Sequence, residues 1–496
     1  MSIRFIDPAT GKDIRSSEFA RRTMAAAVTD NPELAKDILG SPDWRKWYLR
    51  LYAQLAIEEG KSPAQLALMA TSGLNVFRSH LHTSSGTKLS EVIETGFSAD
   101  LVETVVINGT GQAMPIAVAS HTGALEPLAE FWAKAGWAEP GLMESFRFLD
   151  QNPNLTLDGN LLFAVAGAAE FAPTESWLSW GGQVAVLARN KPATWTKLIA
   201  MARASGGSML VPVMRADRST SLSELTDEQL ANIAGLDILE HSQEIASWMN
   251  QLYAKAKSKF ILGLYAYTPK VDHVRVQGVQ ESLAEIAMKN FSNDKLILSW
   301  LATPTDSTPG PASIGQNQVE RFAHRSSGRI IRDSLLGLFN AARPAKPKFF
   351  DSESGEKLVL IDASVQQQGP SYSFSKRTQR WRAYLAHFAG FRVSYQVSPP
   401  ARTQSVLSHK ILRASYQGAP LFGVKPFEVD VAKSASAAAL VRDVLDASAY
   451  SNKDTTTELQ SFSAIHGGLW RLAYNPKSIW IAATLLGLPA LLRRGY

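Results

Sequence analysis

The sequence predicts an α/β protein built on a doubly wound, Rossmann-like parallel sheet. From about residue 155, short apolar runs alternate with amphipathic stretches, a pattern typical of parallel strands joined by crossover helices. Upstream, the apolar residues follow helical spacing, and the chain ends in a further apolar, helical stretch. We therefore expect a mostly helical N-terminal region at 1–150, a Rossmann-like domain at 151–430 and a C-terminal helical extension at 431–496.

The composition is that of an ordinary globular chain and limits the available chemistry. Of its 496 residues, 45% are apolar and 19% are charged. The excess of Lys and Arg over Asp and Glu, 51 against 45, is small and spread along the chain, so nucleic acid is not indicated as a partner. The absence of Cys excludes disulfides, thiolate metal sites and a Cys nucleophile. The N-terminus lacks the apolar core of a secretory signal, so we expect a cytoplasmic protein.

Helices and one hairpin are expected in the N-terminal region. Apolar residues recur at helical spacing after a Ser-Pro-Asp start signal: Trp44, Trp47, Tyr48, Leu51 and Leu55. Two β-like runs within 104–120 flank Gly109 and Gly111 and predict a β-hairpin. His80, His82 and His121 have no carboxylate at ligand spacing, so no metal site is expected.

Seven apolar runs are expected as strands of the sheet: 161–166, 183–188, 209–213, 260–265, 295–301, 357–361 and 392–397. One segment breaks the alternation with helices. Residues 303–355 are rich in Pro, Gly, Ser and basic side chains, with a short helical patch near 332–339. We expect an insertion here, of the kind that covers a substrate at the carboxyl edge of such a sheet.

Gly167 and Arg189 are candidates for binding a dinucleotide. Gly167 follows the first strand of the domain, where glycine lets the backbone approach a pyrophosphate near a helix N-terminus. Arg189 ends the next strand about twenty residues later, where a cation suits the 2′-phosphate of NADP. The alternative is an ordinary strand-to-helix turn, because Gly167 is followed by Ala-Ala-Glu-Phe-Ala without further glycines.

Tyr372 and Lys376 are candidates for proton transfer. Their spacing of four on a helix puts the phenol and the ammonium group on one face. A phenol, whose unperturbed pKa is near 10, acts as an acid or base near neutrality only if a neighbouring cation stabilises the phenolate. The helix leads into a strand that closes in Pro399-Pro400-Ala401-Arg402-Thr403.

This order of a strand, the Gly167 turn, Arg189, the Tyr372/Lys376 helix and a closing PPARTQS resembles the short-chain dehydrogenase/reductase superfamily. More distantly, the segment from GGQVAVLARN to GGSMLVPV is similar to the ketoreductase domains of fatty acid synthases. The resemblance covers about 155–420. It implies that Tyr372 exchanges a proton with the substrate oxygen, while Lys376 lowers the pKa of Tyr372 and holds the ribose of the cofactor.

The family also has a serine near the end of the preceding strand, and its equivalent stays open. Thr303, Thr305 and Ser307 follow one candidate strand and Ser364 the other; we favour Thr305 and Ser307, because the insertion then falls where the family varies its substrate loop. The resemblance implies NADP as cofactor, with these residues binding it: Gly167, Arg189, Lys376, Pro399 and Thr403.

The expected function is an NADP(H)-dependent oxidoreductase that interconverts a carbonyl and an alcohol on a small-molecule, acyl or lipid-like substrate. The alternative is a non-catalytic Rossmann-type protein that binds a nucleotide or a partner. A homo-oligomer is compatible with both.

The apolar run IWIAATLLGLPALL at 479–492 is too short to span a bilayer. As a helix, its 14 residues reach about 21 Å, against about 30 Å of hydrocarbon. The run either packs on the core of the protein or, through 478–496, makes a peripheral membrane contact.

Two further groups carry alternatives. Arg377, Arg380 and Arg382 either meet an anionic ligand or form a solvated helix face, and we expect the solvated face. His466-Gly467-Gly468 is either a tight turn or a ligand edge.

Overall fold

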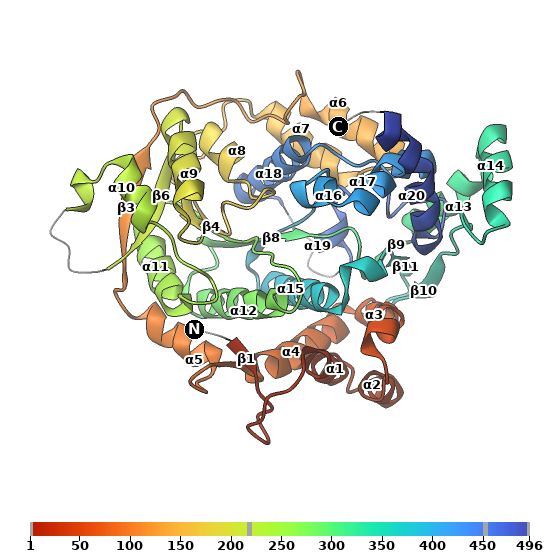
Figure 1. The fold of residues 1–496 in the computed structure, drawn as a ribbon, viewed down its shortest axis with the longest axis horizontal. Helices are drawn as coiled ribbons and strands as arrows, with labels where there is room; N and C mark the ends of the chain where they lie inside the picture. Colours follow the sequence, from red (N-terminus) through yellow and green to blue (C-terminus); the bar gives the residue numbers. More distant parts are fainter. Residues whose placement is uncertain (1–2, 216–220, 450–454, 494–496) are drawn as a thin grey trace.

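A seven-stranded, mixed but mostly parallel sheet runs through the middle of the molecule (Figure 1) in the order β12-β8-β7-β4-β5-β6-β3. The computed structural model describes residues 3–215, 221–449 and 455–493. The strands are β3 (Val102–Asn108), β4 (Leu161–Val165), β5 (Gln183–Leu187), β6 (Ser208–Met214), β7 (Phe260–Leu264), β8 (Leu296–Ala302) and β12 (Arg392–Val397). From central β4 the chain builds outward through β5 and β6, then returns to the other side of β4 and builds through β7, β8 and β12. This α/β arrangement is compatible with a Rossmann-like fold.

Helices cover both faces of this sheet (Figure 1). One face packs against α11 (Ser242–Lys255), α12 (Asp272–Asn290) and α15 (Pro370–Phe388), and the other against α8 (Thr174–Ser179), α9 (Pro192–Ala204) and α18 (Val429–Leu445). Adjacent residues of a strand point to opposite faces. Phe163 accordingly lies in one core, and Leu162 and Ala164 lie in the other. The inner strands β4, β5, β7 and β8 are buried on both sides, which explains their continuous apolar runs.

The N-terminal region adds a further layer below α11, α12 and α15 (Figure 1). It comprises β1 (Ile3–Phe5), α1 (Ser16–Ala26), α2 (Pro32–Leu39), α3 (Trp44–Glu59), α4 (Pro63–Ser79), β2 (Leu81–Thr83) and α5 (Leu89–Phe97). Later in the chain, α6 (Leu125–Ala135) and α7 (Gly141–Gln151) lie on the opposite side with α18, and α10 (Asp227–Ile233) lies beside α9. Residues 1–150 therefore contribute to both cores of the sheet.

The hairpin expected at 104–120 is absent. Only β3 forms, and it pairs antiparallel with β6 at the edge of the sheet, Val105 opposite Val211. The chain then passes close along the segment before β6. The Gly109 amide donates to the Gly207 carbonyl at 2.8 Å, and a Cβ on Gly109 would lie 2.0 Å from the Ser205 carbonyl oxygen. This close approach carries the chain away from β3 rather than back along it.

The expected strand at 357–361 belongs to a second sheet. β11 (Lys357–Asp362) lies between β10 (Lys348–Asp351) and β9 (Ser307–Pro311), antiparallel to both. The insertion at 303–355 thus contains strands as well as the helices α13 (Ala312–Ala323) and α14 (Ser327–Gly337). The other six expected strands lie in the central sheet. A short apolar run does not reveal which strand it will pair with. The strand β11 pairs with β10, to which it is joined by a tight turn at Gly355.

The C-terminal part contains α16 (Gln404–Ser408), α17 (Lys410–Gly418), the 3₁₀ turn η3 (Ala419–Phe422), α19 (Glu458–Ser461) and α20 (Pro476–Arg493). Helix α18 crosses the boundary expected at 430/431 and packs on β12 and α7. α17 and α20 pack very closely: a Cβ on Gly418 would lie 1.9 Å from the Ala483 carbonyl oxygen, and one on Gly487 1.9 Å from that of Ala414. Within the described residues, no helix combines the length and the apolarity needed to cross a bilayer.

Four buried charged side chains tie the N-terminal layer to α15 and the small sheet; we call them the buried ion cluster: Glu59, Asp306, Arg377 and Arg380. Glu59 Oε1 accepts from Arg377 Nη1 at 2.6 Å, and Glu59 Oε2 accepts from Arg380 Nη2 at 2.8 Å. Asp306 forms an ion pair with Arg380. Burial alone would raise the pKa of Glu59, but the facing guanidinium groups lower it below the usual value.

The expectation that Arg377, Arg380 and Arg382 face solvent is therefore wrong. Arg377 and Arg380 belong to the buried ion cluster, and Arg382 Nε donates to buried Glu281 at 3.0 Å. The physical reason is that acidic partners from α3, α12 and the start of β9 neutralise this face of α15.

Replacing Glu59 with Gln should lower the free energy of unfolding by about 3 to 5 kcal/mol, because it leaves a buried positive charge without compensation. Urea denaturation measures this loss. The matched control is Glu94→Gln, which breaks the exposed ion pair with Lys289 and should change stability little. Equal losses in the two variants would contradict the role of the cluster.

Candidate functional site

Tyr372 and Lys376 lie in the first two turns of α15, beside the carboxyl end of β8. The helix begins at Pro370, which suits a first turn because it needs no amide hydrogen there. Gly369 precedes it with φ +79°, a left-handed conformation that favours glycine. As α15 carries the chain from β8 to β12, its N-terminus is set at the sheet edge where β8 ends.

Three polar side chains meet there, and we call them the Thr-Tyr-Lys cluster: Thr303, Tyr372 and Lys376. Lys376 Nζ donates to the carbonyl oxygen of Leu301, near the end of β8, at 2.8 Å. The same Nζ lies 5.8 Å from the centroid of the Tyr372 ring. Thr303, the first residue after β8, lies close enough to Tyr372 for hydrogen bonding to lower the pKa of the phenol. The pair expected from the sequence is thus assembled with a hydroxyl beside it.

Two aromatic side chains extend this cluster, and the sequence analysis missed them. His273, at the start of α12, stacks on Tyr372 with 5.4 Å between ring centroids and 18° between planes. Tyr267 meets both rings edge-on. Neither ring nitrogen of the buried His273 has a hydrogen-bond partner among the described residues. The available signal was position, because Tyr267 and His273 follow β7 much as Thr303 follows β8.

Burial controls the ionisation of this site. It raises the pKa of Tyr372 well above the usual value for a phenol, although the Thr303 hydrogen bond acts in the opposite direction. Burial lowers the pKa of Lys376 to about 8, with Asp306 opposing the shift. Burial and the nearby charge of Lys376 lower the pKa of His273 to about 3. At neutral pH, therefore, Tyr372 holds its proton and His273 is neutral.

Thr305 and Ser307, the hydroxyls favoured from the sequence, lie further from Tyr372 in the hydrogen-bond network. Thr305 Oγ1 is 2.7 Å from Thr303 Oγ1 and also accepts from the Gln368 side chain. Ser307 belongs to β9, where its Oγ is 2.7 Å from Ser364 Oγ and its carbonyl oxygen accepts from Arg377. Of these hydroxyls, that of Thr303 is the one that acts on the pKa of Tyr372.

Gly167 lies in a closed turn and does not form an open phosphate-binding loop. Its amide donates to the Leu187 carbonyl at 3.0 Å, and its carbonyl accepts from Thr174 Oγ1 at 2.6 Å. A Cβ on Gly167 would lie 3.1 Å from Ala164 Cβ and from Val186 Cγ1, so this glycine serves close packing. Its amide is not free to bind phosphate, and α8 behind it has only six residues.

The loop after β4 is joined to the segment after β12. Glu170 accepts from the Gln404 amide at 3.1 Å, next to Thr403, whose side chain caps α16. Pro399 is buried, and Arg189 is exposed at the end of β5. The residues expected to bind the cofactor therefore follow strands of the same sheet edge, and Glu170 joins the loop after β4 to the segment after β12.

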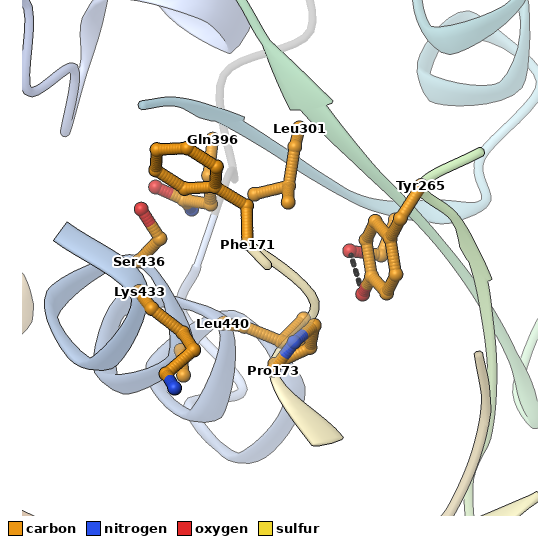
Figure 2. Close-up of a pocket in the computed structure, with 10 residues that line it drawn as sticks. Phe171, Pro173, Tyr265, Leu301, Gln396, Lys433, Ser436 and Leu440 are labelled. Carbon is orange, nitrogen blue, oxygen red and sulfur yellow. Dashed lines mark hydrogen bonds between the residues drawn. The ribbon is translucent and has the colours of Figure 1, made fainter. Parts of the chain in front are cut away.

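Phe171 and Pro173, from the same loop, line a small internal space with residues of α18 (Figure 2). Leu301 and Gln396 close the space from β8 and β12, and the Tyr265 hydroxyl donates to Ser299 Oγ at 2.9 Å at its side. Its volume is about 10 Å³, room for about one water. The loop at 166–173 therefore does not present the open phosphate-binding cradle of a dinucleotide site.

No metal site is found in the described part of the chain, where no three His, Asp or Glu side chains converge at ligand spacing. His466-Gly467-Gly468 forms a tight turn, with both glycines at positive φ. His466 Nε2 is 2.9 Å from Glu139 Oε1, which also accepts from Arg471.

Comparison with protein-family models and with curated proteins finds no match for this chain.

Lys376→Met should remove the increase in unfolding free energy that the native protein shows between about pH 8 and pH 10.5. The pKa of Lys376 is about 8 in the folded protein and near 10.5 when unfolded, so between these values the unfolded state binds more protons. The unfolding free energy of the native protein should rise through this window, and the variant should lack that contribution. Denaturation at pH values below 8 and between 8 and 10.5 measures the difference.

Lys295→Met is the matched control, because Lys295 Nζ also donates to a backbone carbonyl, that of Tyr253, and lies over its ring. An unchanged pH slope in Lys376→Met would contradict the depressed pKa.

Proposed function

We propose that this protein is an NADP(H)-dependent oxidoreductase of the short-chain dehydrogenase/reductase type, which interconverts a carbonyl and an alcohol. The doubly wound topology is part of the proposal. It is supported by the strand order, in which β4 is central, β5 and β6 extend one way, and β7, β8 and β12 extend the other. The acyl or lipid-like substrate expected from the sequence remains the proposed substrate class.

The observation that carries the proposal is the convergence of Thr303, Tyr372 and Lys376 at the carboxyl end of β8. Open α/β sheets bind ligands at this edge, next to the point where the strand order reverses. The three side chains supply a hydroxyl that orients a substrate oxygen, a phenol that carries a proton and a cation beside the phenol.

In this proposal the bound nicotinamide supplies or accepts the hydride. For carbonyl reduction, Tyr372 donates its hydroxyl proton to the oxygen of the substrate, so that hydride and proton together complete the alcohol. Thr303 hydrogen-bonds the same oxygen. Lys376, whose Nζ lies 5.8 Å from the centroid of the Tyr372 ring, stabilises the phenolate that remains. Arg189, exposed at the end of β5, is the proposed partner of the 2′-phosphate.

Tyr372→Phe should lower reduction of a β-ketoacyl thioester such as acetoacetyl-CoA by roughly 10²-fold or more, because it removes the proton donor. Affinity for NADPH, measured by cofactor fluorescence, should be unchanged. Tyr253→Phe is the control, since Tyr253 lies near the opposite end of the sheet, where its hydroxyl accepts from the Ser292 amide. Equal turnover in native protein and Tyr372→Phe would refute the assignment.

A second candidate, a non-catalytic Rossmann-type protein, is favoured by the closed loop at 166–173. Phe171 stands where the resembled family has the second glycine of its loop, and Glu170 bonds the segment after β12. Such a protein would use the sheet edge to hold its own loops together or to bind a partner.

Phe171→Gly and Glu170→Gln distinguish the two candidates. If the loop is an adjustable part of an NADP site, both variants should raise NADPH affinity several-fold, because less energy is needed to open the loop. If the sheet edge only holds its own loops together or binds a partner, NADPH should bind neither variant nor the native protein. A non-catalytic protein that still binds NADPH is distinguished by Tyr372→Phe, which would then leave turnover unchanged. Isothermal titration with NADPH and, as a comparison, NADH provides the measurement.

A further inference from the structure

One face of the molecule combines exposed apolar side chains with an excess of positive charge. It is formed by α14 and the turn after it, by α16 to η3, and by α20, and we call it the apolar–basic face. Figure 1 shows α14 at the periphery of the molecule, with α20 between it and the body. The exposed residues of this face are not members of the Thr-Tyr-Lys cluster, and the inference does not depend on the proposed function.

Helix α14 presents its apolar stripe to solvent. Ile331, Leu335, Leu338 and Phe339 follow helical spacing, and they are 64%, 60%, 79% and 82% exposed. Asp333 is the only buried residue of α14, held by Arg325 and Arg332. The helix is therefore fixed to the body by the buried Asp333 and by the partly buried Leu336, while most of its apolar side chains face solvent.

Helices α17 and α20 continue the same surface. Ile481, Leu485 and Leu488 form an exposed stripe along α20, and Leu407, Ile411 and Leu421 are exposed at α16 to η3. The elements are joined: Arg332 of α14 donates to the Leu421 carbonyl, and the Ala342 amide donates to the Ser478 carbonyl. They also share a small core that includes Phe422, Tyr474 and Ala482.

Basic residues greatly outnumber acidic residues in the segments that form this face. Residues 325–348, 404–427 and 476–493 hold 11 of the chain's 51 Lys and Arg but only one of its 45 Asp and Glu, the buried Asp333. Among the described residues of these ranges, seven basic side chains are exposed: Arg329, Arg343, Lys346, Lys348, Lys410, Lys425 and Lys477. Lys477 forms an ion pair with Asp362, which lies outside these ranges. An isologous contact between two copies would bring two such positive surfaces together, which disfavours a dimer through this face.

We propose that the apolar–basic face docks on the surface of a bilayer that contains anionic lipids. Apolar side chains of α14 and α20 enter the boundary between headgroups and acyl chains, while Arg and Lys around them meet the lipid phosphates. Neither helix spans the membrane, so binding is peripheral and weakens at high salt.

Vesicle flotation of the full chain tests the proposal, with phosphatidylcholine vesicles that contain or lack phosphatidylglycerol. The native protein should bind the anionic vesicles and bind the neutral ones far less. Leu338→Ser with Phe339→Ser should weaken binding roughly tenfold, because two exposed apolar side chains are lost. Met114→Ser with Leu68→Ser is the control, since both are exposed apolar residues elsewhere.

Arg329→Gln, Arg343→Gln and Lys346→Gln together should weaken binding to anionic vesicles roughly 100-fold, whereas Lys197→Gln, Lys255→Gln and Lys257→Gln should not. All these sites are exposed, so thermal unfolding should match that of the native protein. Failure of the native protein to bind anionic vesicles would overturn the proposal. So would equal binding by the apolar double variant, or light scattering that shows a dimer which the same variant abolishes.

Discussion

The buried ion cluster is the constraint on which the arrangement of this molecule depends. Glu59 ends α3, Asp306 precedes β9, and both hold Arg377 and Arg380 of α15. Two anions and two cations balance, so each charge is stable inside the protein only while the other three stay in place. Trp381 adds a hydrogen bond to Glu59 at 2.7 Å. The N-terminal layer, the crossover helix and the small sheet are therefore fixed to each other by one set of charges.

This anchoring explains how the candidate site can tolerate unfavourable burial. Lys376 directly precedes Arg377 on α15, and Tyr372 lies one turn before Lys376. Both side chains therefore keep their positions although burial disfavours the charge of either one. Asp306 links the two regions, because its charge acts on Lys376 as well as on Arg380. The stability of the buried ion cluster thus allows Tyr372 and Lys376 to stay buried with shifted pKa values, as is common at functional sites.

The sequence was informative where one local pattern determines one structure. Six strands of the central sheet were predicted because burial on both faces requires continuous apolar runs, and the four-residue spacing of Tyr372 and Lys376 defines their common face. The sequence did not indicate which side chains contact each other across distant parts of the chain. Arg377 at helical spacing looks the same whether it faces water or Glu59, which lies 318 positions away. Thr303 and His273 contact Tyr372 through the packing of different crossover units, which no single segment encodes.

The backbone contacts of Gly418 and Gly487 leave α17 and α20 no freedom to slide against each other. The two helices are therefore expected to move together as one unit. Tyr416, in the last turn of α17, is close enough to Tyr372 to oppose ionisation of the Tyr372 phenol. A displacement of α20 would therefore also move α17, and with it the Tyr416 side chain whose charge acts on Tyr372.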